Sequence, residues 1–420
     1  MPAHQRPALG DLLIGAAIPL TLPFGIALEM ALLCLAIYAL RLLWRQRGRP
    51  WPNALREYFV LALLLWLAGA ISAIDAEHPG RALAWLGAAI GYVLAGAALV
   101  MVCDDPDRRG AVLLGAAVPV ACWTLDATLQ AVTGWSLGGA ASADRLSGVF
   151  GADDLKLGPV LALLAPFLLI ATQQISARRS RRFALIVSGL ALTLVVLLAG
   201  ARAGWIGLAV VGLALSAHWQ AHQPRRWLLA LTAGLLVTLL LTGLAYQQSE
   251  RFAARIDRTL TAFDGNRKGL DHALAGRLPI FETAVTAARA HPLNGIGVRG
   301  FRQSYPRYAA SGDPWVSPDG QTGASHPHHW VLEVAAEQGA IGLLAWLLLT
   351  GWLIHRWWRA DTSARSAALA PALALLTLLF PLNTHPALYS SFWQALCWWC
   401  LGLYLGCLST RAGTSTEPQA

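Results

Sequence analysis

The chain has 420 residues, of which 56% are hydrophobic and only 13% are charged, and its mean hydropathy is +0.51. Soluble domains usually carry about 25% charged residues, so this composition excludes an ordinary soluble protein. The formal net charge is +9, but most basic residues stand in short connections between apolar stretches. This distribution indicates membrane topology and not a nucleic-acid partner.

Apolar stretches follow one another along most of the chain, and most are long enough to cross a hydrocarbon core of about 30 Å as a helix. They lack the alternation of barrel strands, so an all-α integral membrane protein with about 12 transmembrane helices is predicted. We expect the first stretch to be a retained helix and not a cleaved signal peptide. The predicted spans are 10–27, 28–44, 56–74, 81–102, 110–131, 157–176, 183–200, 203–218, 227–246, 329–355, 366–382 and 388–408.

The arginine distribution predicts the orientation, because Lys and Arg accumulate in cytoplasmic connections. Arginines cluster in every second connection, which places both termini in the cytoplasm. The predicted organisation is nine helices in residues 1–246 with a short external loop at 132–156, a large external loop containing short helices at 247–328, three helices at 329–408, and a cytoplasmic tail at 409–420.

The large loop carries ten basic residues against seven acidic ones, although it is predicted to lie outside the cytoplasm. Long translocated segments can carry such charge, so solvated arginines are one interpretation. The other is a site for a phosphate-bearing lipid, because Arg binds phosphate oxygens in a bidentate manner.

Three histidines, His326, His328 and His329, stand where the loop meets the next span. Ser325 as N-cap and Pro327 in the first turn predict that a helix begins there. A neutral histidine can accept a proton from a hydroxyl, so a general base is one hypothesis. The alternatives are histidines that only anchor the helix end, and a zinc site that uses His326 or His329 with a carboxylate, since His329 shares a helix face with Glu333 and Glu337.

Arginines at three other places are candidate anion ligands. Arg202 lies at a very short junction between two spans, where it either needs an anionic partner or extends to the membrane surface. Arg277 begins an amphipathic stretch, and Arg299 follows a turn rich in Gly and Pro that can expose N–H groups to an anion. The short external loop adds Arg145 and the pair Asp153–Asp154, which either binds a divalent ion or caps a helix.

Several motifs are similar to those of one family. They are Arg145-Leu-Ser-Gly-Val-Phe-Gly151, Gly200-Ala-Arg-Ala-Gly-Trp205, Gly276-Arg277, Pro292-Leu-Asn-Gly-Ile-Gly297, and His328 placed eleven residues before Gly339-Ala-Ile-Gly342. Over residues 140–345 the chain therefore resembles the O-antigen ligase and polymerase superfamily. It departs from the pattern at His329, where the family more often has Asn, Ser or Gln.

The resemblance implies a GT-C-like glycosyltransferase of the bacterial inner membrane. Its donor would be a glycan on undecaprenyl diphosphate, and its acceptor would be a sugar hydroxyl of lipid A–core at the periplasmic face, among membrane lipids. His328 would be the base that permits inversion at the anomeric carbon, with His326 as the alternative. Arg202, Arg277, Arg299 and Arg145 would bind the diphosphate, and neither a metal nor another cofactor is expected.

Other functions are compatible with the sequence. An O-antigen polymerase of the same superfamily would use a second lipid-linked glycan as acceptor, and a protein O-oligosaccharyltransferase would use Ser or Thr. A transporter or flippase would place ionisable residues and broken helices near the middle of the membrane, often in matching halves. The predicted spans are nearly free of charge and show no internal repeat, which favours the glycosyltransferase.

Overall fold

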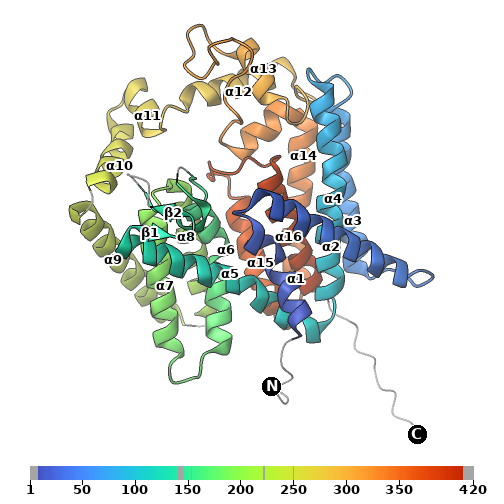
Figure 1. The fold of residues 1–420 in the computed structure, drawn as a ribbon, viewed down its shortest axis with the longest axis vertical. Coiled ribbons are helices and arrows are strands. Elements are labelled where there is room, and N and C mark those ends of the chain that lie inside the picture. The colour runs from blue at the N-terminus through green and yellow to red at the C-terminus, as the bar shows by residue number, and fades with distance from the viewer. Residues whose placement is uncertain (1–7, 141–144, 153, 221–222, 249, 410–420) are drawn as a thin grey trace.

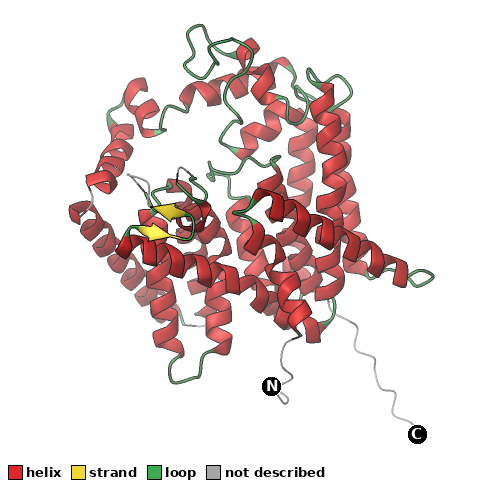
Figure 2. Cartoon of the chain, viewed as in Figure 1, coloured by secondary structure: helices red, strands yellow, loops and turns green. Residues whose placement is uncertain are grey.

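The computed structural model describes residues 8–140, 145–152, 154–220, 223–248 and 250–409. Within these ranges the chain is almost entirely helical (Figure 2), and the only strands are β1 (Trp135–Ser136) and β2 (Gly139–Ala140), a two-stranded antiparallel hairpin. The prediction of an all-α integral membrane protein is confirmed. Most of the predicted tail, 409–420, lies outside the described residues.

Each predicted span coincides with a helix. These helices are α1 (Leu9–Thr21), α2 (Gly25–Arg45), α3 (Asn53–Ser72), α4 (Pro79–Cys103), α5 (Pro106–Thr133), α6 (Leu157–Ile175), α7 (Arg181–Leu198), α8 (Arg202–Trp219), α9 (Pro224–Gln248), α14 (Trp330–Arg359), α15 (Thr362–Leu378) and α16 (Ser391–Leu408). Among the described residues, nine of them are long and apolar enough to cross a membrane. The other three are α1 and α15, which are shorter apolar helices, and α8.

The helix α16 lies at the centre of the bundle and α9 at its edge, since 89% of an 18-residue stretch of α16 is buried, against 6% for α9. Large apolar side chains of α9 such as Leu236 and Leu240 are 66% and 62% exposed. Such a surface is stable in lipid and not in water. Small residues allow α4 to cross α16 closely, because a Cβ added to Gly402 would lie 2.3 Å from the carbonyl oxygen of Gly96.

The large loop forms an arch of short helices that runs from α9 to α14 (Figure 1). Its elements are α10 (Glu250–Leu260), the 3-10 turn η2 (Thr261–Phe263), α11 (Arg267–Ala273), α12 (Leu278–Ala290) and α13 (Phe301–Tyr308). The start of α1 and the end of α16 lie at the opposite side of the molecule from this arch (Figure 1). The short loop before α6 contains the 3-10 turn η1 (Gly148–Phe150).

The first part of α14 is broken at Gly339, whose φ of 60° and ψ of −154° are not helical. The turn formed by residues 292–297 fills this break with four backbone hydrogen bonds. The N–H groups of Ile296 and Gly297 donate to Ala336 and Glu337, while the N–H groups of Ala340 and Ile341 donate to Pro292 and Leu293. The peptide groups released by the break are therefore satisfied by the arch.

Replacing Gly339 with Ala should destabilise the protein, because a Cβ would lie 2.5 Å from the carbonyl carbon of Leu293 and would force an L-residue to a φ of 60°. We expect a loss of about 2 kcal/mol or more in the free energy of unfolding in detergent. Gly351→Ala in the same helix is the control, since no neighbouring atom lies within 4 Å of its Cβ position. Equal stability of the two variants would contradict this account of the break.

Candidate active site

Two adjoining cavities lie between the arch and the membrane helices. The larger has a volume of about 740 Å³ and contains His326 and His328, so it is named the histidine cavity. The smaller, of about 340 Å³, is named the arginine cavity, and its basic lining residues are Arg145, Arg202, Arg255, Arg258 and Arg277. Arg277 and His385 line both cavities, so they mark the place where the two meet.

The segment that precedes α14 presents two neighbouring histidines to the histidine cavity. The ring centroids of His326 and His328 lie 3.9 Å apart, and Nδ1 of His326 is 2.9 Å from Oγ of Ser325. The Nε2 atom of His326 is buried and has no hydrogen-bond partner among the described residues. The two histidines predicted as candidate bases are thus neighbours in one cavity.

The predicted start of this helix is wrong. The helix α14 begins at Trp330 with His329 at its N-cap, so Ser325 and Pro327 belong to an irregular loop. The reason is His328, whose φ of 51° lies in the left-handed region and cannot continue a right-handed helix. Such strain in a non-glycine residue is typical of functional sites.

All three histidines at the cavities are neutral at pH 7. Burial, followed by the charges of Arg277 and Arg299, lowers the pKa of His326 to about 4. Burial and neighbouring His326 lower the pKa of His328 to about 2, and burial and Arg277 lower that of His385 to about 3. A bound anion would offset the arginine charges and raise these pKa values, which would make the imidazoles stronger proton acceptors.

His385 is a residue that the sequence analysis missed. It lies in the connection between α15 and α16, and its ring packs edge-on against Trp393 at a centroid distance of 5.7 Å. The available signal was Asn383-Thr384-His385-Pro386, a polar run in a connection predicted to face the same side as the large loop. Nothing in the sequence indicates that this connection reaches Arg277.

Two buried carboxylates of α14 hold the loops that carry site residues. Glu333, which is 1% exposed, accepts backbone hydrogen bonds from Leu388 at 2.6 Å and Tyr389 at 3.4 Å. Glu337, which is 3% exposed, accepts them from Arg299 at 2.6 Å and Phe301 at 3.2 Å. A buried carboxyl group that accepts two backbone N–H groups fixes the segment that donates them, so Glu333 and Glu337 position His385 and Arg299.

The zinc hypothesis for His329, Glu333 and Glu337 gains no support from this arrangement, because both carboxylates are occupied by the loops. Within the part of the chain that the structure describes, no group of three or more His, Cys, Asp or Glu side chains could hold a metal ion. Asp153 lies outside the described residues. Asp154 forms an ion pair with Lys156 at 2.5 Å and accepts a hydrogen bond from its backbone N–H.

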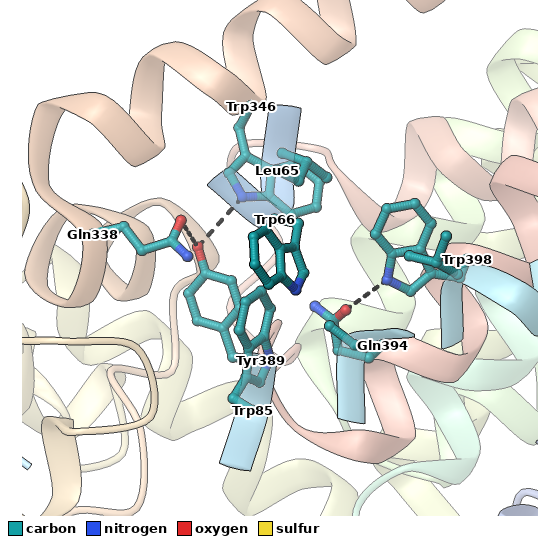
Figure 3. Close-up of a pocket in the computed structure, with 10 residues that line it drawn as sticks. Leu65, Trp66, Trp85, Gln338, Trp346, Tyr389, Gln394 and Trp398 are labelled. Carbon is teal, nitrogen blue, oxygen red and sulfur yellow. Dashed lines mark hydrogen bonds between the residues drawn. The ribbon is translucent and has the colours of Figure 1, made fainter. Parts of the chain in front are cut away.

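Below the His385 connection, a small aromatic cavity contains a buried hydrogen-bond network (Figure 3). The hydroxyl of Tyr389 donates to Oε1 of Gln338 at 2.7 Å and accepts from the indole N–H of Trp346 at 3.4 Å. Gln394 donates to the carbonyl of Leu388 at 2.7 Å and accepts from the indole N–H of Trp398. These hydrogen bonds tie the connection that carries His385 to α14 and α16 in an apolar environment.

The arginine cavity collects three of the four predicted anion ligands. Arg202 is the first residue of α8 and donates a hydrogen bond to the carbonyl of Ala273. Arg277 precedes α12, and Arg145 reaches the cavity from the short loop. The preceding Gly200 has a φ of 72°, and a Cβ there would lie 2.1 Å from a guanidinium nitrogen of Arg255. A glycine is thus required before Arg202.

Basic side chains dominate the arginine cavity. Its described lining includes five arginines and no Asp or Glu. Burial and the nearby charge of Arg202 lower the pKa of Arg277 below its ordinary value. Like charges held this close in a partly buried site favour the binding of an anion.

Arg299 lines the histidine cavity together with Arg277, and it does not line the arginine cavity, where Arg145 and Arg202 lie. Its φ of 63° lies in the left-handed region, and the hydrogen bond from its N–H to Glu337 holds this conformation. Arg81 and Arg302, which were not predicted as site residues, also line the histidine cavity.

Inorganic pyrophosphate should bind to the purified protein, and Arg277→Ala should weaken this binding by about 10- to 100-fold, which corresponds to the loss of one or two hydrogen bonds to a charged group. Arg267→Ala is the control, because Arg267 is exposed in the same arch and is paired with Glu282 at 2.6 Å. Isothermal titration calorimetry measures the affinity of wild type and of both variants for pyrophosphate. Equal weakening by the two substitutions would show that the arch attracts anions without a specific site.

Residues 186–347 match the family model described as O-antigen ligase. A comparison of the chain with curated proteins found no match. The matched region includes the histidines before α14, Arg202, Arg277 and Arg299. Arg81, Arg145 and His385 lie outside it.

Proposed function

The chain belongs to the O-antigen ligase superfamily through residues 186–347, and from this premise we propose that it is an O-antigen ligase of the bacterial inner membrane. The family establishes a membrane-bound glycosyltransferase of the ligase or polymerase type. The proposed reaction transfers a glycan from undecaprenyl diphosphate to a sugar hydroxyl of lipid A–core at the periplasmic face. The observation that carries this proposal is the meeting of a cationic cavity with a cavity that contains neutral histidines.

The arginine cavity is proposed to bind the diphosphate of the donor. Guanidinium groups bind phosphate oxygens in a bidentate manner, and Arg202 lies at the N-terminus of α8, where the helix dipole also favours an anion. Apolar side chains of the same cavity, such as Ile206 and Leu382, would face the lipid part of the donor. Arg277, at the junction of both cavities, would contact the diphosphate close to the bond that breaks.

In the histidine cavity, His328 is proposed to accept the proton of the acceptor hydroxyl, with His326 as the alternative base. The oxygen then attacks the anomeric carbon, and the bond from this carbon to the diphosphate oxygen breaks with inversion. The electron pair goes to the undecaprenyl diphosphate, whose increasing charge Arg202 and Arg277 would stabilise. Arginines can provide this stabilisation, so the proposed mechanism requires no metal.

A polymerase or a protein O-oligosaccharyltransferase would use the same donor site and the same base, and would differ only in the acceptor. Purified protein in liposomes containing EDTA should transfer the lipid-linked glycan to lipid A–core, with the product detected as a mass shift on a gel. Exclusive transfer to a second lipid-linked glycan would identify a polymerase, and exclusive transfer to a Ser or Thr peptide would identify an oligosaccharyltransferase. Activity that disappears in EDTA and returns with a metal ion would contradict the mechanism.

His328→Ala should reduce turnover to background and leave pyrophosphate binding nearly unchanged, because the imidazole serves the acceptor and not the diphosphate. His272→Ala, at an exposed position in α11, controls for loss of an arch histidine. The rate of transfer is measured at saturating donor and acceptor. Near-normal turnover of His328→Ala together with an inactive His326→Ala would assign the base to His326.

A further inference from the structure

The histidine cavity contains cations for which the proposed reaction has no use. The reaction needs a base there, whereas the diphosphate is assigned to the arginine cavity. Yet Arg81, Arg299 and Arg302 all line the histidine cavity. None of these three guanidinium groups forms an ion pair within the described part of the chain.

The acidic residues of the histidine cavity are fewer than its basic residues. Its two acidic lining residues in the described ranges are Asp154 and Glu337. Asp154 is paired with Lys156 at 2.5 Å, which leaves Glu337 as the one remaining acid against Arg81, Arg277, Arg299 and Arg302. The described lining of the cavity therefore has an excess of positive charge.

Arg81 and Arg302 come from elements that are distant in the sequence, α4 and α13, and both side chains are exposed. They lie at the rim of the cavity, whereas the histidines are partly buried inside it. A rim cation stays hydrated and attracts an anion mainly during encounter and initial binding. Its position suits a charged substituent of the acceptor better than the reacting bond itself.

The walls of the cavity also divide between two parts of the sequence. The histidines, Arg299 and Arg302 lie within the region that matches the O-antigen ligase family, 186–347, whereas Arg81, His385 and Phe392 lie outside it. The cavity therefore combines residues of the matched region with residues from outside it. Residues outside the match, such as Arg81, can differ between members of the family and can contribute to selection of the acceptor.

We propose that the histidine cavity selects an acceptor glycan that carries a phosphate or carboxylate group near its accepting hydroxyl, and that Arg81 and Arg302 bind this group. The inference rests on the proposed glycosyl transfer and adds the chemical class of the acceptor. Phosphate and carboxylate are the anions that a pair of guanidinium groups recognises. Binding of this group orients the neighbouring hydroxyl toward the histidines.

The test compares Arg81→Gln, Arg302→Gln and the double variant with wild type. Arg289→Gln is the matched control, because Arg289 is exposed in α12 of the same arch and lines neither cavity. Each protein is assayed with native acceptor, with phosphatase-treated acceptor and with acceptor whose carboxylates have been reduced. Pyrophosphate binding confirms that each variant is folded.

We expect each single substitution to raise KM for the native acceptor about threefold and the double substitution about tenfold, the range for exposed charge contacts. Neither kcat nor the KM for the donor should differ between wild type and these variants. Removal of one of the two anionic groups from the acceptor should raise the wild-type KM by a similar factor and should have little further effect on the double variant. If phosphatase treatment raises the wild-type KM, the group is a phosphate. If reduction of the carboxylates raises it, the group is a carboxylate.

A higher KM for the donor in the double variant would assign these arginines to the diphosphate and overturn the inference. The inference would also be overturned if the double variant raised KM by the same factor for the native acceptor and for the acceptor without its anionic groups. An effect seen only when phosphatidylglycerol is added to a neutral detergent would show that the two arginines bind a lipid headgroup. Failure of wild type to transfer glycan to any acceptor would instead refute the proposed function, on which the inference depends.

Discussion

The site depends on one backbone interaction, the insertion of the turn 292–297 into the break of α14 at Gly339. A helix that is interrupted at the edge of a membrane leaves peptide groups that lipid cannot satisfy. The arch supplies the missing partners of α14 through Pro292, Leu293, Ile296 and Gly297. This pairing fixes the arch on the bundle, and it brings Arg299 and the histidine loop to the same end of α14.

The arginines of the site also affect the histidines. The charge of Arg202 lowers the pKa of Arg277, and the charge of Arg277 adds to burial, the largest cause, in lowering the pKa of His326 and His328. The proposed diphosphate would offset the charge of Arg277 and raise the proton affinity of the imidazoles, so binding of the donor would be coupled to the strength of the base.

Much of the fold follows from the sequence, because the apolar length of a span depends on local composition. All predicted spans coincide with helices, and the histidines, Arg145, Arg202 and Arg277 gather at two adjoining cavities. The start of α14 was wrong because the left-handed conformation of His328 depends on tertiary packing. His385 and Arg81 were missed, since their positions depend on contacts between distant segments that no local pattern reveals.

The two buried glutamates of α14 also constrain the number of residues that can separate them. Glu333 holds the connection that carries His385, and Glu337 holds the turn that carries Arg299. They face their loops because four residues separate them, slightly more than one helical turn. A single inserted residue between them would rotate one carboxylate by about 100°. The spacing of the two glutamates along α14 therefore sets the relative positions of the loops that carry His385 and Arg299. An insertion or deletion between Glu333 and Glu337 would misplace one of these loops.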